Sequence, residues 1–223
     1  MSGCRELWQY FSERYPLHRY VPLALFLSAG LIYVEPRNPV WARFAEHLVW
    51  IWILLFPLRL LDDLYSIEED RRQAPQRVLC RTGNPGWFHR VLYVSAAVDA
   101  LLLWAIHNPR SGLLYLLLFL FLHFWYAAAQ RYAGLKRIFF VPLIKYPLLL
   151  GLLSSVSWYE ARLWTCQALL LAVFILYEIA HDPKYATAFP SLRQFPGQKY
   201  RSLRYIPFAG AMVWFGLAIF FGH

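Results

Sequence analysis

The chain has 223 residues, of which 59% are hydrophobic, 19% aromatic and only 16% charged. A soluble domain has closer to half of its residues apolar, so this composition excludes an ordinary soluble protein and indicates a membrane protein. The formal net charge of +9 at pH 7 would suit a nucleic-acid partner. The basic residues are instead distributed by membrane side, and we expect no nucleic-acid partner.

Residues 1–20, MSGCRELWQYFSERYPLHRY, mix Leu7, Trp8 and Phe11 with charges and reach a helix-breaking proline at Pro16. This pattern predicts an amphipathic helix at the membrane interface, and an ordinary frayed terminus is the alternative. We expect no cleavable signal peptide in this stretch. The three cysteines are expected on the cytoplasmic side or inside an apolar segment, which argues against a disulfide framework.

Seven apolar segments follow, and each can be tested against the roughly 20 residues that cross about 30 Å of hydrocarbon. We therefore predict an all-α membrane protein, with residues 1–223 forming one transmembrane helical domain of about seven helices around a central cavity. The first segment is the shortest. The segments are 21–34, 40–61, 88–106, 111–130, 138–156, 160–180 and 205–221.

The basic residues favour one side of this seven-segment path. Seventeen of the 22 Lys and Arg residues fall in the N-terminal stretch and in the loops at 59–90, 131–137 and 184–204. Four fall on the other side, and Lys145 alone lies inside a segment. The positive-inside rule then places the N-terminus and these three loops in the cytoplasm.

The second segment ends in an acidic cluster, LLDDLYSIEED, with five of the chain's 13 acidic residues at positions 62–70. A helix continued past Leu61 would carry Asp62, Ser66 and Asp70 on one side, flanked by Asp63 and Glu69. Oxygen ligands of this kind suit Mg²⁺, which joins one or two carboxylates to substrate phosphates. The alternative is a solvated helix end whose acids pair with neighbouring arginines.

The sixth segment ends in LYEIAHDPKY, where Glu178, His181 and Asp182 share a helix face. Metal or phosphate binding is one interpretation, and a C-terminal cap before Pro183 is the other. Basic side chains suited to a diphosphate lie on the same predicted membrane side. They are Arg77, Lys136 and Arg137, with Lys184 as a further contact.

The order of these features resembles the UbiA family of intramembrane prenyltransferases, over roughly residues 40–190. Asp62, Asp63, Ser66 and Asp70 fall on the four positions of that family's NDxxDxxxD motif, and APQRVL at 74–79 is similar to its P-x-R-P-L. LKR at 135–137 is similar to the basic pair after the fourth helix. Glu178 and Asp182 match a reduced second acidic motif.

The resemblance implies a helical bundle whose cytoplasmic end binds Mg²⁺ and a prenyl diphosphate substrate. It implies Asp62, Asp63, Asp70, Glu178 and Asp182 as catalytic residues, with Ser66 and Glu69 as further ligands. HFWYAAAQRY at 123–132 is the candidate pocket wall, through Phe124, Trp125 and Tyr126. The chain departs from the family at Ser66, which replaces a carboxylate, and in having seven segments where nine are typical.

Three functions remain open. Transfer of the prenyl group to an aromatic or lipid acceptor is the family's usual activity. Cyclisation without an acceptor, as in a class I terpene synthase, fits a loose DDxxxxE pattern in DDLYSIE. A transporter or scaffold is the non-enzymatic alternative, in which Asp99, His123 and Lys145 inside segments would form a relay. The sequence leaves open the length of the prenyl chain, the identity of the acceptor and the oligomeric state of the protein.

We predict that position 72 faces the cytoplasm and that position 223 faces the opposite side, because of the asymmetric distribution of Lys and Arg. Single cysteines introduced at Arg72 and His223 should react with an impermeant thiol reagent from opposite sides of sealed vesicles. Labelling of both from the same side would rule out the seven-segment path.

Overall fold

The computed structural model describes residues 3–35, 40–132, 134–135, 138, 140–156 and 158–181, and all regular elements within these ranges are helical. Four helices among them are long and apolar enough to cross a membrane. The predicted all-α membrane character is therefore confirmed for this part of the chain, while the bundle of seven helices stays a prediction. The four spans are Val40–Tyr65, Pro85–His107, Pro109–Arg131 and Ala161–Ile179.

The chain divides into two compact units. Unit 1 contains Met1–Leu25 and Glu46–Ile138, and unit 2 contains Phe26–Ala45 and Phe139–His223. Two helices run from one unit into the other, namely α2 (Leu17–Val34) and α3 (Val40–Tyr65).

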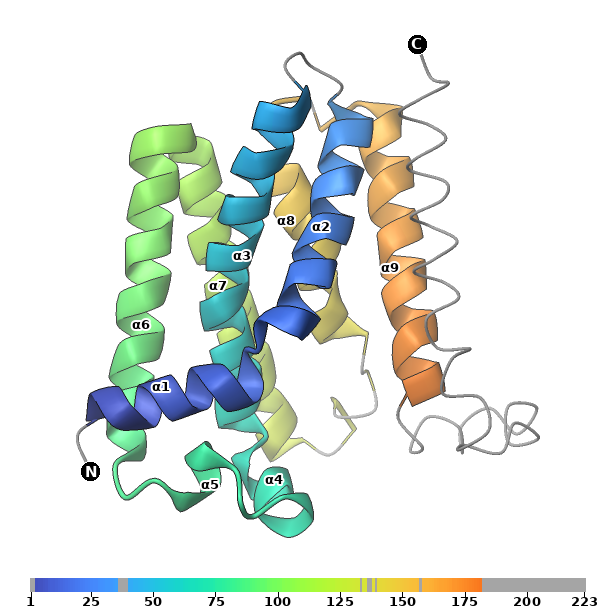
Figure 1. The fold of residues 1–223 in the computed structure, drawn as a ribbon. Coiled ribbons are helices and arrows are strands. Elements are labelled where there is room, and N and C mark those ends of the chain that lie inside the picture. Colours follow the sequence, from blue (N-terminus) through green and yellow to red (C-terminus); the bar gives the residue numbers. More distant parts are fainter. Residues whose placement is uncertain are drawn as a thin grey trace. The chain divides into compact units, whose positions relative to one another are not determined.

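Unit 1 is built around the lower part of α3 and a pair of long helices (Figure 1). The pair consists of α6 (Pro85–Leu102), extended by the π-helix η1 (Leu103–His107), and α7 (Pro109–Arg131). Three shorter helices lie at the end of this unit where α3 terminates: α1 (Gly3–Arg14), α4 (Ile67–Gln73) and α5 (Val78–Arg81). Helix α1 occupies the predicted amphipathic stretch and ends before Pro16.

The joint between α6 and α7 depends on a tight turn and a glycine. The Asn108 side chain accepts a hydrogen bond from the Ser111 amide at 2.7 Å, and Pro109 occupies the first turn of α7. A Cβ atom at Gly112 would lie 2.5 Å from the Ala100 carbonyl oxygen. Only glycine therefore lets the two helices approach this closely.

Helix α3 contains Pro57, which cannot donate a backbone hydrogen bond to the preceding turn. Tyrosine hydroxyls bond two carbonyl groups nearby. Tyr15 donates to the Trp52 carbonyl, and the Tyr115 hydroxyl shares its one hydrogen between the Asp99 carboxylate at 3.2 Å and the Leu54 carbonyl at 3.3 Å. Pro57 deprives the Ile53 carbonyl of its helical donor, so these two bonds are additional to the helical pattern, and α3 continues unbroken from Val40 to Tyr65.

Unit 2 contains a 3₁₀ turn, η3 (Val141–Ile144), followed by α8 (Lys145–Leu153) and α9 (Ala161–His181). The sequence predicted one segment over 138–156, but the helical part is Val141–Leu153 and is too short to count as a span. Pro147 lacks the amide needed for a bond one turn back, and the 3₁₀-to-α transition lies in this region. The seventh predicted segment, 205–221, lies outside the described residues.

We predict that Gly112→Ala destabilises the protein by about 1–3 kcal/mol, because the new methyl group meets a backbone carbonyl that cannot rotate away. Thermal unfolding of the detergent-solubilised protein measures the effect. Gly83→Ala is the matched control, since a Cβ atom there has nothing within 4 Å. Equal stability of the two variants would contradict the close helix contact.

Candidate functional site

The end of α3 carries a buried carboxylate, Asp63, whose side chain is 1% exposed. Arg14 bonds both of its oxygens, with Nε at 3.0 Å from Oδ2 and Nη2 in contact with Oδ1. Arg59, one helical turn earlier, places Nη2 2.8 Å from Oδ1. The Tyr10 hydroxyl donates to Oδ2 at 2.9 Å. Two guanidinium groups and a phenol thus compensate the cost of removing this carboxylate from water.

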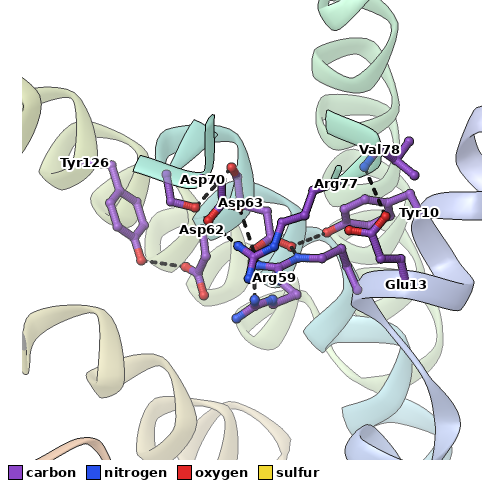
Figure 2. Close-up of polar contacts among 11 residues, drawn as sticks. Tyr10, Glu13, Arg59, Asp62, Asp63, Asp70, Arg77, Val78 and Tyr126 are labelled. Carbon is purple, nitrogen blue, oxygen red and sulfur yellow. Dashed lines mark hydrogen bonds and ion pairs between the residues drawn. The ribbon is translucent and has the colours of Figure 1, made fainter. Parts of the chain in front are cut away.

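A second carboxylate, Asp70 on α4, joins the same cluster. Arg77 forms an ion pair with its Oδ1, and Arg14 Nη2 lies 3.9 Å from its Oδ2. The backbone bonds Ser66 N to Asp62 O and Asp70 N to Ser66 O carry the helical pattern across the break between α3 and α4. We call Arg14, Arg59, Asp63, Asp70 and Arg77 the arginine–aspartate cluster (Figure 2).

Helix α1 is joined to this end of unit 1 by further contacts. Glu13 Oε2 accepts a hydrogen bond from the Val78 amide at 3.0 Å, and Glu6 accepts one from the Thr82 hydroxyl at 2.8 Å. Phe11 stacks on Phe56 of α3 with ring centroids 4.6 Å apart. Helix α1 thus contacts the rest of unit 1 through both its polar and its apolar side chains.

The electrostatic environment shifts the pKa of two groups in α1, Tyr10 and Arg14. Burial, with the neighbouring Asp63 charge, raises the pKa of Tyr10 well above its ordinary value, so its hydroxyl remains a hydrogen-bond donor. Burial alone would lower the pKa of Arg14. The hydrogen bond to Asp63 and the negative charges of Asp63 and Asp70 together outweigh that effect and raise the pKa, so Arg14 stays charged.

Asp62, although adjacent to Asp63, has a different environment. Its Oδ1 accepts a hydrogen bond from the Tyr126 hydroxyl on α7 at 2.5 Å. Figure 2 shows the Asp62 side chain directed at Tyr126, on the side away from Tyr10 and Glu13. The Tyr126 ring stacks on Tyr65, with centroids 5.3 Å apart. The Tyr65 hydroxyl lies 3.3 Å from His123 Nδ1. We call Asp62, Tyr65, His123 and Tyr126 the Asp62 group.

The other predicted site residues fall in several places. The Ser66 hydroxyl bonds the Asp63 carbonyl, and exposed Glu69 accepts a hydrogen bond from Gln73 on the same helix. Of the predicted pocket wall, Tyr126 contacts Asp62, Trp125 is half-buried and Phe124 is 69% exposed. Four further predictions lie outside the described residues: Lys136, Arg137, Asp182 and Lys184.

Glu178 lies on α9 within unit 2 and is half-buried. Asp62, Asp63 and Asp70 belong to unit 1. The predicted union of the two acidic motifs in one site therefore stays a prediction.

A Mg²⁺ site needs oxygen ligands that are free to coordinate the ion. Among the described residues, no group of three His, Cys, Asp or Glu side chains is placed to hold a metal ion. Both oxygens of Asp63 bond cationic or phenolic donors, and Arg77 pairs with Asp70. These two carboxylates do not fit a metal in this arrangement. Asp62 accepts a hydrogen bond from the Tyr126 hydroxyl, and an ion bound there would draw its other ligands from a diphosphate and water.

Sequence reasoning missed Tyr10, Glu13, Arg14 and Arg59 as parts of this site. Arg59 had a local signal, because it precedes Asp63 by four residues on a helix. Arg14 and Tyr10 had none, since 49 and 53 residues separate them from Asp63. Comparison with known proteins adds no assignment: no family model, curated protein or solved structure matches the chain.

We predict that Arg14→Gln lowers the free energy of unfolding by about 1.5–3 kcal/mol, because buried Asp63 loses its two-point partner. Arg71→Gln is the matched control. Arg71 pairs with Glu68 on the surface, with side chains 55% and 74% exposed, and should contribute less than about 1 kcal/mol. Thermal or denaturant unfolding in detergent measures both variants, and equal losses would contradict the special role of Arg14.

Proposed function

We propose that the chain is a UbiA-like integral membrane enzyme that acts on a prenyl diphosphate with Mg²⁺. The observation that supports this proposal is the end of α3. There the arginine–aspartate cluster adjoins Asp62, and Asp62 contacts Tyr126 of the membrane-spanning helix α7, whose ring stacks on Tyr65 of α3. A substrate with an anionic head and an isoprenoid chain matches a charged helix end beside an aromatic wall.

Arg59 is suited to the anionic head. Its Nε atom is buried and has no hydrogen-bond partner within the described part of the chain. A buried N–H without an acceptor is unfavourable, and a diphosphate oxygen would satisfy it. Guanidinium groups also bind phosphate oxygens through paired hydrogen bonds.

The proposed chemistry begins with cleavage of the allylic C–O bond, whose electron pair leaves with the diphosphate. Bound Mg²⁺ would neutralise charge on that leaving group, with Asp62 as the carboxylate ligand. Arg59 stabilises the same negative charge by electrostatics. The stacked rings of Tyr65 and Tyr126 would stabilise the developing cation by a cation–π contact, which contributes about 0.5–2 kcal/mol.

Two outcomes follow from the same ionisation. In transfer, the prenyl carbon bonds to an acceptor carbon, which then releases a proton. In cyclisation, a double bond of the same chain attacks the cation, and loss of a proton or capture of water completes the reaction. Transfer is the proposed activity and cyclisation the alternative. We place the acidic motifs at the cytoplasmic end, with membrane lipid around the helices.

A transporter or scaffold is the second candidate, and buried polar groups favour it. Asp99 is 4% exposed and accepts a hydrogen bond from Tyr115 at 3.2 Å, between membrane-spanning helices α6 and α7. Lys145 in unit 2 is 3% exposed, with its ammonium 5.3 Å from the Tyr146 ring centroid. Ionisable groups within membrane segments commonly mark transport pathways. These two groups belong to different units, so they give no evidence of one relay.

We predict that the purified protein releases diphosphate from geranyl, farnesyl or geranylgeranyl diphosphate when Mg²⁺ is present. Asp62→Asn should reduce the rate at least about tenfold, because the metal loses its carboxylate. Glu68→Gln, an exposed acid of the same stretch, is the matched control and should retain activity.

Product analysis separates the candidates. A hydrocarbon or terpene alcohol formed from the prenyl diphosphate alone indicates cyclisation, whereas a requirement for an added acceptor indicates transfer. Absence of diphosphate release from all three substrates would contradict both enzymatic functions and favour the transporter or scaffold.

A further inference from the structure

Asp62 and Asp63 are adjacent carboxylates of one motif, yet their contacts differ in kind. Asp63 is buried and contacts Tyr10 and Arg14 of α1 together with Arg59. Asp62 is half-buried and contacts Tyr126 of α7. Consecutive residues on a helix point about 100° apart, so the two carboxylates face different neighbours.

We propose that Asp63 is a positioning residue, which fastens α1 to α3 and orients Arg59 toward the substrate diphosphate, while Asp62 alone of this pair serves the metal. The part that concerns Arg59 and the metal rests on the proposed function. The part that concerns α1 rests only on the contacts within unit 1.

The fastening role follows from the geometry of the ion pair. Arg14 approaches Asp63 through two nitrogens, and this two-point contact fixes orientation as well as distance. Arg14 comes from α1 and Arg59 from α3, so one carboxylate adds a charged link between these helices to the stacking of Phe11 on Phe56. Removing the Asp63 charge would leave two guanidinium groups facing each other without a shared counter-ion.

The positioning role follows from the remaining donors of Arg59. Asp63 engages its Nη2 atom, which limits rotation of the guanidinium plane. The buried Nε–H has no acceptor in the described residues, and it is the donor that a ligand oxygen would satisfy. Without Asp63, the guanidinium would turn to other partners and this donor would lose its fixed direction.

The test compares Asp62→Asn with Asp63→Asn, which are isosteric changes at neighbouring positions. Hydrogen exchange of α1 amides, measured on the full-length protein in detergent without substrate, should accelerate at least about tenfold in Asp63→Asn and stay at the wild-type rate in Asp62→Asn. Glu68→Gln is the control for a lost carboxylate outside both groups and should leave the exchange unchanged.

Kinetics of diphosphate release then separate positioning from metal binding and from a merely structural role. Asp63→Asn should raise the KM for the prenyl diphosphate roughly tenfold with the half-saturating Mg²⁺ concentration unchanged. Substitution of a metal ligand would instead raise the half-saturating Mg²⁺ concentration, and we expect this effect only for Asp62→Asn. Substitution of a purely structural residue would reduce the fraction of active protein and leave the KM for the prenyl diphosphate unchanged.

Unchanged exchange of α1 in Asp63→Asn would overturn the fastening role, and either of the other kinetic patterns would overturn the positioning of Arg59. If Asp63→Asn does not yield folded protein, hydrogen exchange of α1 is measured on Arg14→Lys in its place. Lysine keeps the positive charge and loses the two-point contact with Asp63. If the wild-type protein releases no diphosphate, the proposed function fails, while the exchange of α1 still decides the fastening role.

Discussion

The removal of the Asp63 carboxylate from water is the constraint on which this end of the molecule depends. An ionised carboxylate at a helix end is tolerated only where cations and hydrogen-bond donors replace its hydration. Arg14, Arg59 and Tyr10 supply these groups from two helices. The position of α1 is therefore a consequence of the electrostatics of α3 as much as of its own amphipathic pattern.

This constraint also divides the acidic motif into two parts. Carboxylates that hold arginines in place lose the freedom to bind a metal, because each oxygen has few lone pairs to share. Asp63 and Asp70 belong to the arginine–aspartate cluster, whereas Asp62 accepts a hydrogen bond from Tyr126 of α7. A row of acids in a sequence can thus serve structure and chemistry at once, with the division set by which helix each residue faces.

The sequence predicted the general character of the chain well. Hydrophobic run lengths gave the positions of α3, α6, α7 and α9, because a membrane span requires an unbroken apolar stretch. The weaker predictions concerned 21–34 and 138–156, where the apolar helices Tyr20–Val34 and Val141–Leu153 are too short to count as spans. Hydropathy does not register that prolines shorten a helix. Candidate functional residues on α3 could also be found locally, although Lys136, Arg137, Asp182 and Lys184 lie outside the described residues.

By itself the sequence determined an all-helical membrane protein with a charged end on α3, since composition and periodicity are properties of short stretches. Tertiary structure alone decided that Asp63 pairs with Arg14 and that Asp62 contacts Tyr126, across 49 and 64 positions of chain. Pairings over such distances leave no periodic signal. They depend on how helices pack, and packing decides that Asp63 meets Tyr10 and Arg14 of α1 while Asp62 meets Tyr126 of α7.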